Sequence, residues 1–220
     1  MMRTFLALVR RDLALATRVG GAGGLSLVFF LMVVTLIPFG LGPDLNLLSR
    51  IGPAILWIAG VLATLIGLDR LFQADEEDGS LDLMRLSPAP FEVVVLAKAT
   101  AHWLATGLPL AVFAPLFGLL VALEPAALAR TALSLLIGTP ALTFAGAIGA
   151  ALAASIRRGG LVIAILVVPL MVPTLIFGVA AGDPTNPASA QALTILAALT
   201  LATGAIGCIG AAAALRGGGE

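Results

Sequence analysis

The chain has 220 residues, 60% of them hydrophobic and 11% charged, with a mean hydropathy of +1.12. A soluble domain is roughly half apolar and about a quarter charged, so the composition excludes an ordinary soluble fold and predicts an all-α polytopic membrane protein. The formal net charge of zero gives no attraction to nucleic acid, and a single cysteine, Cys208, excludes an internal disulfide.

Residues 1–19 predict an amphipathic helix that lies in the membrane interface. On a helix of about 100° per residue, Arg3, Arg10, Arg11 and Arg18 share one face, and apolar side chains cover the other. Asp12 is the exception, because it falls on the apolar face. The arginines leave no apolar core of the length that a signal peptide needs. The alternative interpretation is a plain cytosolic extension.

Six apolar runs approach the roughly 20 residues that a transmembrane helix needs. They cover, approximately, residues 25–41, 47–68, 100–123, 131–154, 161–181 and 191–215. With the N-terminus in the cytoplasm, ten of the twelve lysines and arginines flank the cytoplasmic side, and only Arg50 and Arg130 flank the other. This bias predicts one membrane domain, residues 1–220, with six transmembrane helices and both termini in the cytoplasm.

One long loop, residues 69–99, collects much of the polar chemistry of the chain. Its first part, residues 69–90, holds six of the twelve acidic residues, namely Asp69, Asp75, Glu76, Glu77, Asp78 and Asp82. Since charge in hydrocarbon is costly, the loop must face water, and its apolar residues are then available to contact something other than lipid. We interpret the loop as a docking surface; the alternative is a solvated face without a partner.

The local sequence of this loop predicts two helical pieces. The second span is expected to continue as a helix to Asp78, where Gly79 breaks it. Ser80 is expected to cap a short helix that runs to about Arg85. Asp82 falls in the first turn of that helix, where a negative charge suits the helix dipole.

The chain lacks the residues of a self-contained enzyme. It has no Gly-x-x-x-x-Gly-Lys-Ser/Thr phosphate loop, no cysteine or histidine pair for zinc, and no nucleophile beside an identifiable base. The single histidine, His102, is a weak candidate for a haem ligand. A histidine satisfied by a hydrogen bond at the membrane interface is the preferred alternative, and no metal site is predicted.

Small residues and prolines mark two of the predicted spans. Pro169 and Pro173 are the best candidates for a functional helix break, with tolerated kinks as the alternative. Gly204, Gly207 and Gly210 recur at three-residue spacing, which predicts close approach to a neighbouring helix.

The stretch from Asp75 to Pro88 resembles the cytoplasmic motif of permeases of the type 2 ABC exporter class: acidic residues, then Gly-Ser-Leu-Asp, apolar residues and a proline. More narrowly, the chain resembles the haem exporter protein B family (CcmB-like permeases) of cytochrome c maturation. Further matching stretches are residues 50–57, 69–72, 95–103, 107–110, 136–140, 157–160, 169–173 and 211–216. The chain departs from the family pattern at Asp82, at Arg158 and in a short loop over residues 183–190.

The resemblance implies a non-catalytic permease subunit in the bacterial inner membrane. Its partners would be an ABC ATPase subunit that binds ATP, a haem-handling membrane protein and a periplasmic haem chaperone, in a complex with two copies of the chain. No cofactor is expected to bind the chain directly, and haem would be a substrate of the complex. ATP hydrolysis would drive either haem export or release of the haem-loaded chaperone, and both remain open.

The resemblance also implies that the short helix couples the permease to its ATPase. The predicted partner-binding residues are Asp75, Glu76, Glu77, Asp78, Gly79, Ser80, Leu81, Asp82, Leu83, Met84, Arg85 and Leu86. Their leucines and methionine would enter a groove on the partner, and their charges would set orientation. The alternatives are a channel or secondary transporter, which would need polar residues lining its spans, and a membrane assembly subunit that transports nothing.

Overall fold

The computed structural model describes residues 1–17, 21–68, 70–87, 89–154 and 159–217, with side chains from residue 165 onward in the last range. Throughout this part of the chain, the regular secondary structure is helical. The elements are α1 (Met2–Ala16), α2 (Ala22–Leu41), α3 (Leu45–Leu65), α4 (Arg70–Glu77), α5 (Ser80–Arg85), α6 (Phe91–Ala105), α7 (Gly107–Gly118), the 3₁₀ helix η1 (Leu119–Val121), α8 (Pro125–Ala153), α9 (Gly159–Gly182) and α10 (Ser189–Gly217).

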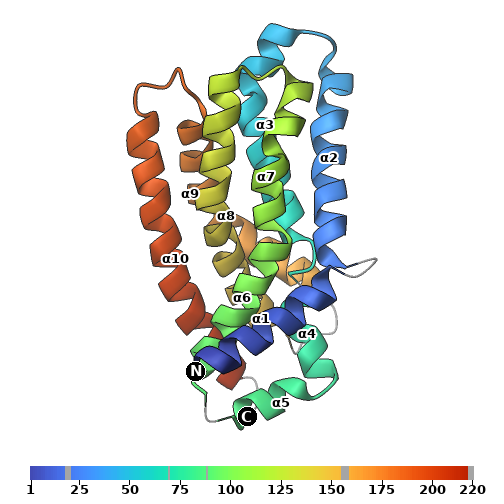
Figure 1. The fold of residues 1–220 in the computed structure, drawn as a ribbon, viewed down its shortest axis with the longest axis vertical. Helices are drawn as coiled ribbons and strands as arrows, with labels where there is room; N and C mark the ends of the chain where they lie inside the picture. The colour runs from blue at the N-terminus through green and yellow to red at the C-terminus, as the bar shows by residue number, and fades with distance from the viewer. Residues whose placement is uncertain (18–20, 69, 88, 155–158, 218–220) are drawn as a thin grey trace.

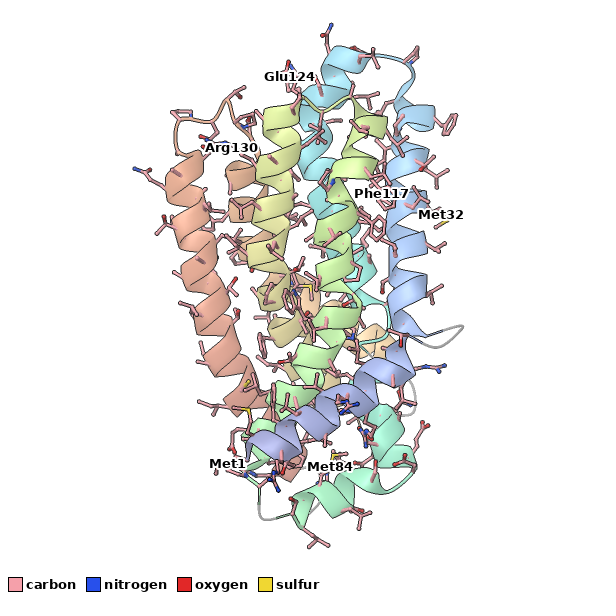
Figure 2. The ribbon with its side chains drawn as sticks, viewed as in Figure 1. Met1, Met32, Met84, Phe117, Glu124 and Arg130 are labelled. Atoms are coloured by element: carbon pink, nitrogen blue, oxygen red, sulfur yellow. The ribbon has the colours of Figure 1, made fainter. Side chains whose placement is uncertain are left out.

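Six helical segments are long and apolar enough to cross a membrane, which confirms the predicted fold class. They are Ala22–Leu41, Leu45–Glu77, Phe91–Val121, Pro125–Ala153, Ile165–Gly182 and Ser189–Gly217. Figure 1 shows them running along the long axis of a bundle, with α1 crossing obliquely at one end and α4 and α5 closing that same end. We call this the α5 end; Glu124 and Arg130 mark the opposite end, and Met1 and Met84 the α5 end, in Figure 2.

The second span does not continue as one helix to Asp78, so that prediction is wrong. α3 ends at Leu65, Ile66 is extended at ψ 122°, and Gly67 takes a left-handed φ of +82°. A new helix, α4, begins at Arg70. A Cβ at Gly67 would collide with Ala22 of α2, so tertiary packing adds to the need for glycine at this turn. Asp69 lies outside the described residues.

The third span is also made of two helices. α6 begins at Phe91, well before the predicted start at residue 100, and ends at Ala105; the next residue, Thr106, has distorted helical angles of φ −117° and ψ −69°. Pro109 lies in the first turn of α7, where its missing N–H is tolerated. The Thr106 hydroxyl donates to the His102 carbonyl at 2.7 Å, which gives the end of α6 a side-chain hydrogen bond.

Trp57 lies in the core and not at a membrane interface. Its side chain is fully buried, and its indole Nε1 donates to the Ser134 hydroxyl on α8 at 2.9 Å. Gly138 of α8 and Gly178 of α9 leave the space that the ring occupies. A buried indole thus keeps its hydrogen bond, as buried polar groups generally do.

The glycines of α10 pack against α8 as predicted. A Cβ at Gly207 would lie 2.7 Å from the backbone oxygen of Phe144, whereas at Gly204 and Gly210 the nearest atoms are 3.8 Å away. The closest approach is therefore at Gly207. In α9, the helix continues through both Pro169 and Pro173, as the alternative of tolerated prolines expects.

Candidate functional site

The two short helices at the α5 end form a hairpin around Gly79. Gly79 has a left-handed φ of +74° and ends α4, and α5 starts at the next residue. The Asp78 carboxylate accepts the Ser80 N–H at 2.8 Å, and hydrogen bonding by Ser80 holds the pKa of Asp78 below its ordinary value. Asp82 lies in the first turn of α5, as predicted. We call residues 70–86 the α4–α5 hairpin.

Ser80 does not cap α5 with its side chain, which corrects the prediction. It is the first residue of the helix, and its hydroxyl donates to Asp75 Oδ1 at 2.8 Å. Its hydroxyl therefore joins α5 to α4. Gly79 occupies the N-cap position of α5, in a left-handed conformation. The carboxylate of Asp78, one residue earlier, accepts the Ser80 N–H at the start of the helix.

The apolar side chains of the hairpin point in two directions. Leu81 is fully buried, as is Phe72, and Met84 packs partly buried against the core. Leu83 and Leu86 are 71% and 83% exposed. The predicted docking helix thus has an inner face that packs on its own bundle and an outer apolar face that is open.

The acidic residues of the hairpin divide in the same way. Asp75 is buried, Glu76 is half-buried near Arg85, and Glu77, Asp78 and Asp82 are exposed. The exposed carboxylates and the open leucines belong to the same hairpin. Partner contact by the twelve predicted residues stays a prediction, and in this arrangement Asp75 and Leu81 support the hairpin from inside.

Asp75 belongs to a ring of four charges drawn from three helices. Arg11 of α1 donates through Nη2 to Asp75 Oδ1 at 2.9 Å and through Nε to Asp12 Oδ1 at 2.7 Å. Lys98 of α6 closes the ring, because its Nζ lies 2.8 Å from Asp12 Oδ2 and pairs with Asp75 Oδ2. We call Arg11, Asp12, Asp75 and Lys98 the ion-pair ring.

The ring has no net charge and is mostly shielded from solvent. Lys98 is 4% exposed and Asp75 5%; the ammonium of Lys98 also lies 5.9 Å from the centre of the Phe72 ring. Burial alone lowers the pKa of Arg11, but the hydrogen bond and charge of Asp12, and then those of Asp75, raise it above its ordinary value. Buried charges persist in proteins when they are paired in this way.

Sequence reasoning missed Arg11, Asp12 and Lys98 as site residues. Two signals were present: Asp12 falls on the apolar face of its helix, and Lys98 stands in an otherwise apolar stretch. The structure explains the first. The apolar face of α1 packs on α6 through Val9 against Ala97 and Ala101, so an aspartate on that face points at Lys98.

A second connection joins the hairpin to the end of the chain. Arg85 donates through Nη2 to the carbonyl of Leu215 in the last turn of α10, at 2.8 Å, and through Nη1 to Asp82 at 2.6 Å. A cation suits a helix C-terminus. Beside this contact lies a small cavity, which is lined by Glu76, Arg85, Ala151, Leu152, Ala154, Ala214 and Leu215.

His102 lies inside the bundle near the turn at Gly67. Its side chain is 7% exposed, so a haem iron could reach it only if the surrounding helices separated. Its role as a haem ligand therefore stays an untested prediction. Among the described residues, no group of three or more His, Cys, Asp or Glu side chains could hold a metal ion.

A family model described as CcmB protein matches residues 3–218. The chain belongs to the CcmB protein family. It is 56% identical over 220 residues to "Heme exporter protein B" of Bradyrhizobium diazoefficiens, with 99% of each chain covered. The protein of that name from Paracoccus denitrificans is 55% identical over 217 residues (96% of this chain, 97% of the relative), and that of Escherichia coli K12 is 44% identical over 215 residues (96% and 97%). The CcmB match spans both the α4–α5 hairpin and the ion-pair ring.

Proposed function

We propose that this CcmB protein is the membrane-spanning permease subunit of an ABC transporter complex for cytochrome c maturation. It couples ATP hydrolysis by a partner subunit to haem export or to release of a haem-loaded periplasmic chaperone. The haem export part of this proposal rests on the name of its relatives, "Heme exporter protein B". The observation that carries the coupling role is the open apolar face of α5, where Leu83 and Leu86 stand exposed at one end of an otherwise membrane-spanning bundle.

The proposal assigns partners by chemistry. An ABC ATPase with an apolar groove receives Leu83 and Leu86, and a basic rim on that groove meets the exposed carboxylates of Glu77, Asp78 and Asp82. Charges at such a rim set orientation and encounter rate more than affinity. The α5 end then faces the cytoplasm of a cell with this chain in its inner membrane, and both termini lie on that side. A haem-handling membrane protein and a periplasmic haem chaperone complete the complex, which holds two copies of this chain.

Affinity purification of the tagged chain from native membranes in mild detergent tests the assembly. Mass spectrometry of the eluate and an ATPase assay should detect a stoichiometric ATP-binding subunit together with haem-chaperone proteins. A homo-oligomer without ATPase activity in several detergents would contradict the permease role.

The variant Leu83→Ser/Leu86→Ser tests the docking face. Serine at both positions removes the apolar surface that the leucines would bury in a partner's groove, so we expect at least about a tenfold loss of co-purified ATPase at unchanged membrane levels of the chain. Leu45→Ser is the matched control, because Leu45 is 64% exposed at the opposite end of the bundle. Equal ATPase recovery from both variants would exclude α5 as the docking element.

A further inference from the structure

The ion-pair ring places one carboxylate between the docking helix and the third span. Asp75 accepts the hydroxyl of Ser80, the first residue of α5, on Oδ1 and pairs with Lys98 of α6 on Oδ2. α5 and α6 are thereby joined through a single buried side chain. Arg11 and Asp12 of α1 hold the same pair from the other side.

The ring resists opening one link at a time. Its two cations and two carboxylates alternate around a closed path, and Lys98 and Asp75 are almost fully buried. Moving one helix away from the other two takes at least one partner from a buried charge, which is unfavourable in a site shielded from water. α1, α4 and the first part of α6 are therefore expected to move as one body with the start of α5.

On the side of α10, the attachment of α5 is less continuous, although α4 also packs against α8. Toward α8 and α10, the contact made by Arg85 with the Leu215 carbonyl stands beside the small cavity described above. A displacement of α5 can be absorbed in that space. On the side of Lys98, by contrast, the buried Phe72 ring lies close to the Lys98 ammonium.

We propose that Lys98 and Asp75 are positioning residues that transmit movement of the docked α5 to α6, with α1 clamping the pair through Arg11 and Asp12. This inference rests on the proposed function, since it needs an ATPase that moves α5. It assigns to the N-terminal helix a part in transmission, beyond lying in the membrane interface.

The test uses the complete complex in native membranes and a charge-balanced variant. Asp12→Asn/Lys98→Met removes one cation and one anion, so Arg11 and Asp75 remain paired and no charge is left alone. We expect normal membrane levels, normal co-purification of the ATPase and unchanged basal ATP turnover. Cytochrome c assembled per ATP hydrolysed should fall by about fivefold or more, the size of a typical coupling between sites.

The matched control is Arg216→Met, which removes an exposed ion pair of 2.8 Å between α10 and Glu92 of α6 at the same end. It should leave the ratio unchanged, and Lys98→Arg, which keeps the charge, should retain most of it. An unaltered ratio in the balanced double variant would overturn the inference. Loss of ATPase from the wild-type complex would overturn the proposed function itself, and this inference with it.

Discussion

Lys98 carries its charge at 4% exposure between two carboxylates. Replacing it with methionine leaves Asp12 and Asp75 with Arg11 as their sole partner in the ring. Removing one partner of a buried pair costs about 3–5 kcal/mol, so Lys98→Met should lower the unfolding free energy by that order. Chemical denaturation in mixed micelles measures the loss.

The charge-balanced variant distinguishes two causes of lost stability, an unpaired buried charge and a missing side-chain contact. Asp12→Asn/Lys98→Met should recover most of the stability, because replacing a whole buried pair is often nearly neutral. The exposed ion pair of Arg216 serves for comparison, since Arg216→Met should lower the unfolding free energy by less than about 1 kcal/mol. Equal losses in Lys98→Met and the double variant would mean that the ring is not electrostatically coupled.

At the residue scale, sequence alone predicted exposure and burial better than partners. Glu77, Asp78 and Asp82 of the acidic run are exposed as predicted, but Asp75 is buried. Its pairing with Arg11 joins positions 64 residues apart. Such contacts depend on how the helices pack. The position of Asp12 on the apolar face of its helix indicated an unusual site. It did not identify Lys98 as the partner, because helical periodicity shows which face a side chain lies on but not which residue of another helix it contacts.

At the element scale, Gly79 determines how α5 leaves α4. Its φ of +74° lies in the left-handed region, and nothing within 4 Å would obstruct a Cβ. Backbone conformation alone therefore opposes substitution, at about 1–2 kcal/mol for an ordinary L residue. Gly79→Ala should increase hydrogen exchange of the α5 amides by about tenfold, as expected for a local loss of about 1.4 kcal/mol.

Gly79→Asn is the control for this prediction, because asparagine tolerates left-handed geometry better than alanine does. Its exchange should lie between that of the wild type and Gly79→Ala. Exchange that is the same in all three proteins would mean that the turn does not limit α5.

Element boundaries were predictable where local sequence decides them. Gly79 and the short α5 follow from turn and dipole chemistry that neighbouring residues supply. The interruption at Thr106 was missed because it lies within a continuous apolar run, and the one at Gly67 because the helix was expected to continue past the end of its run. At Gly67 the contact with Ala22 of α2 helps to fix the turn, which is information from another helix.

At the scale of the whole molecule, six spans were predictable because the length of an apolar run is set by the thickness of the bilayer. The packing of those spans was not. Trp57 is of a residue type common at membrane interfaces, yet it fills space left in the core by Gly138 and Gly178. Among the contacts between spans, the sequence predicted the one made by α10, through the three-residue spacing of its glycines.

The contact of α10 with α8 gives a prediction with an internal control. Gly207→Ala places a Cβ 2.7 Å from a backbone oxygen of Phe144, and overpacking of this kind costs about 1–3 kcal/mol. Gly204→Ala makes the same change where the nearest atom is 3.8 Å away. It should be neutral or stabilise the helix by about 0.5–1 kcal/mol. Thermal unfolding in detergent compares the two, and similar midpoints would contradict this packing.

The hydrogen bond from Arg85 to the Leu215 carbonyl places the end of α10 directly beside the helix that we propose docks the ATPase. A purification handle or fluorescent reporter fused to the C-terminal side of α10 therefore follows a helix end that lies close to the proposed docking site. A spacer of about 20 Gly/Ser residues, with a root-mean-square reach of about 25 Å, would carry the fusion clear of that site. Shortening the spacer stepwise and measuring ATPase binding at each length would then show how far the space occupied by the subunit extends from the end of α10.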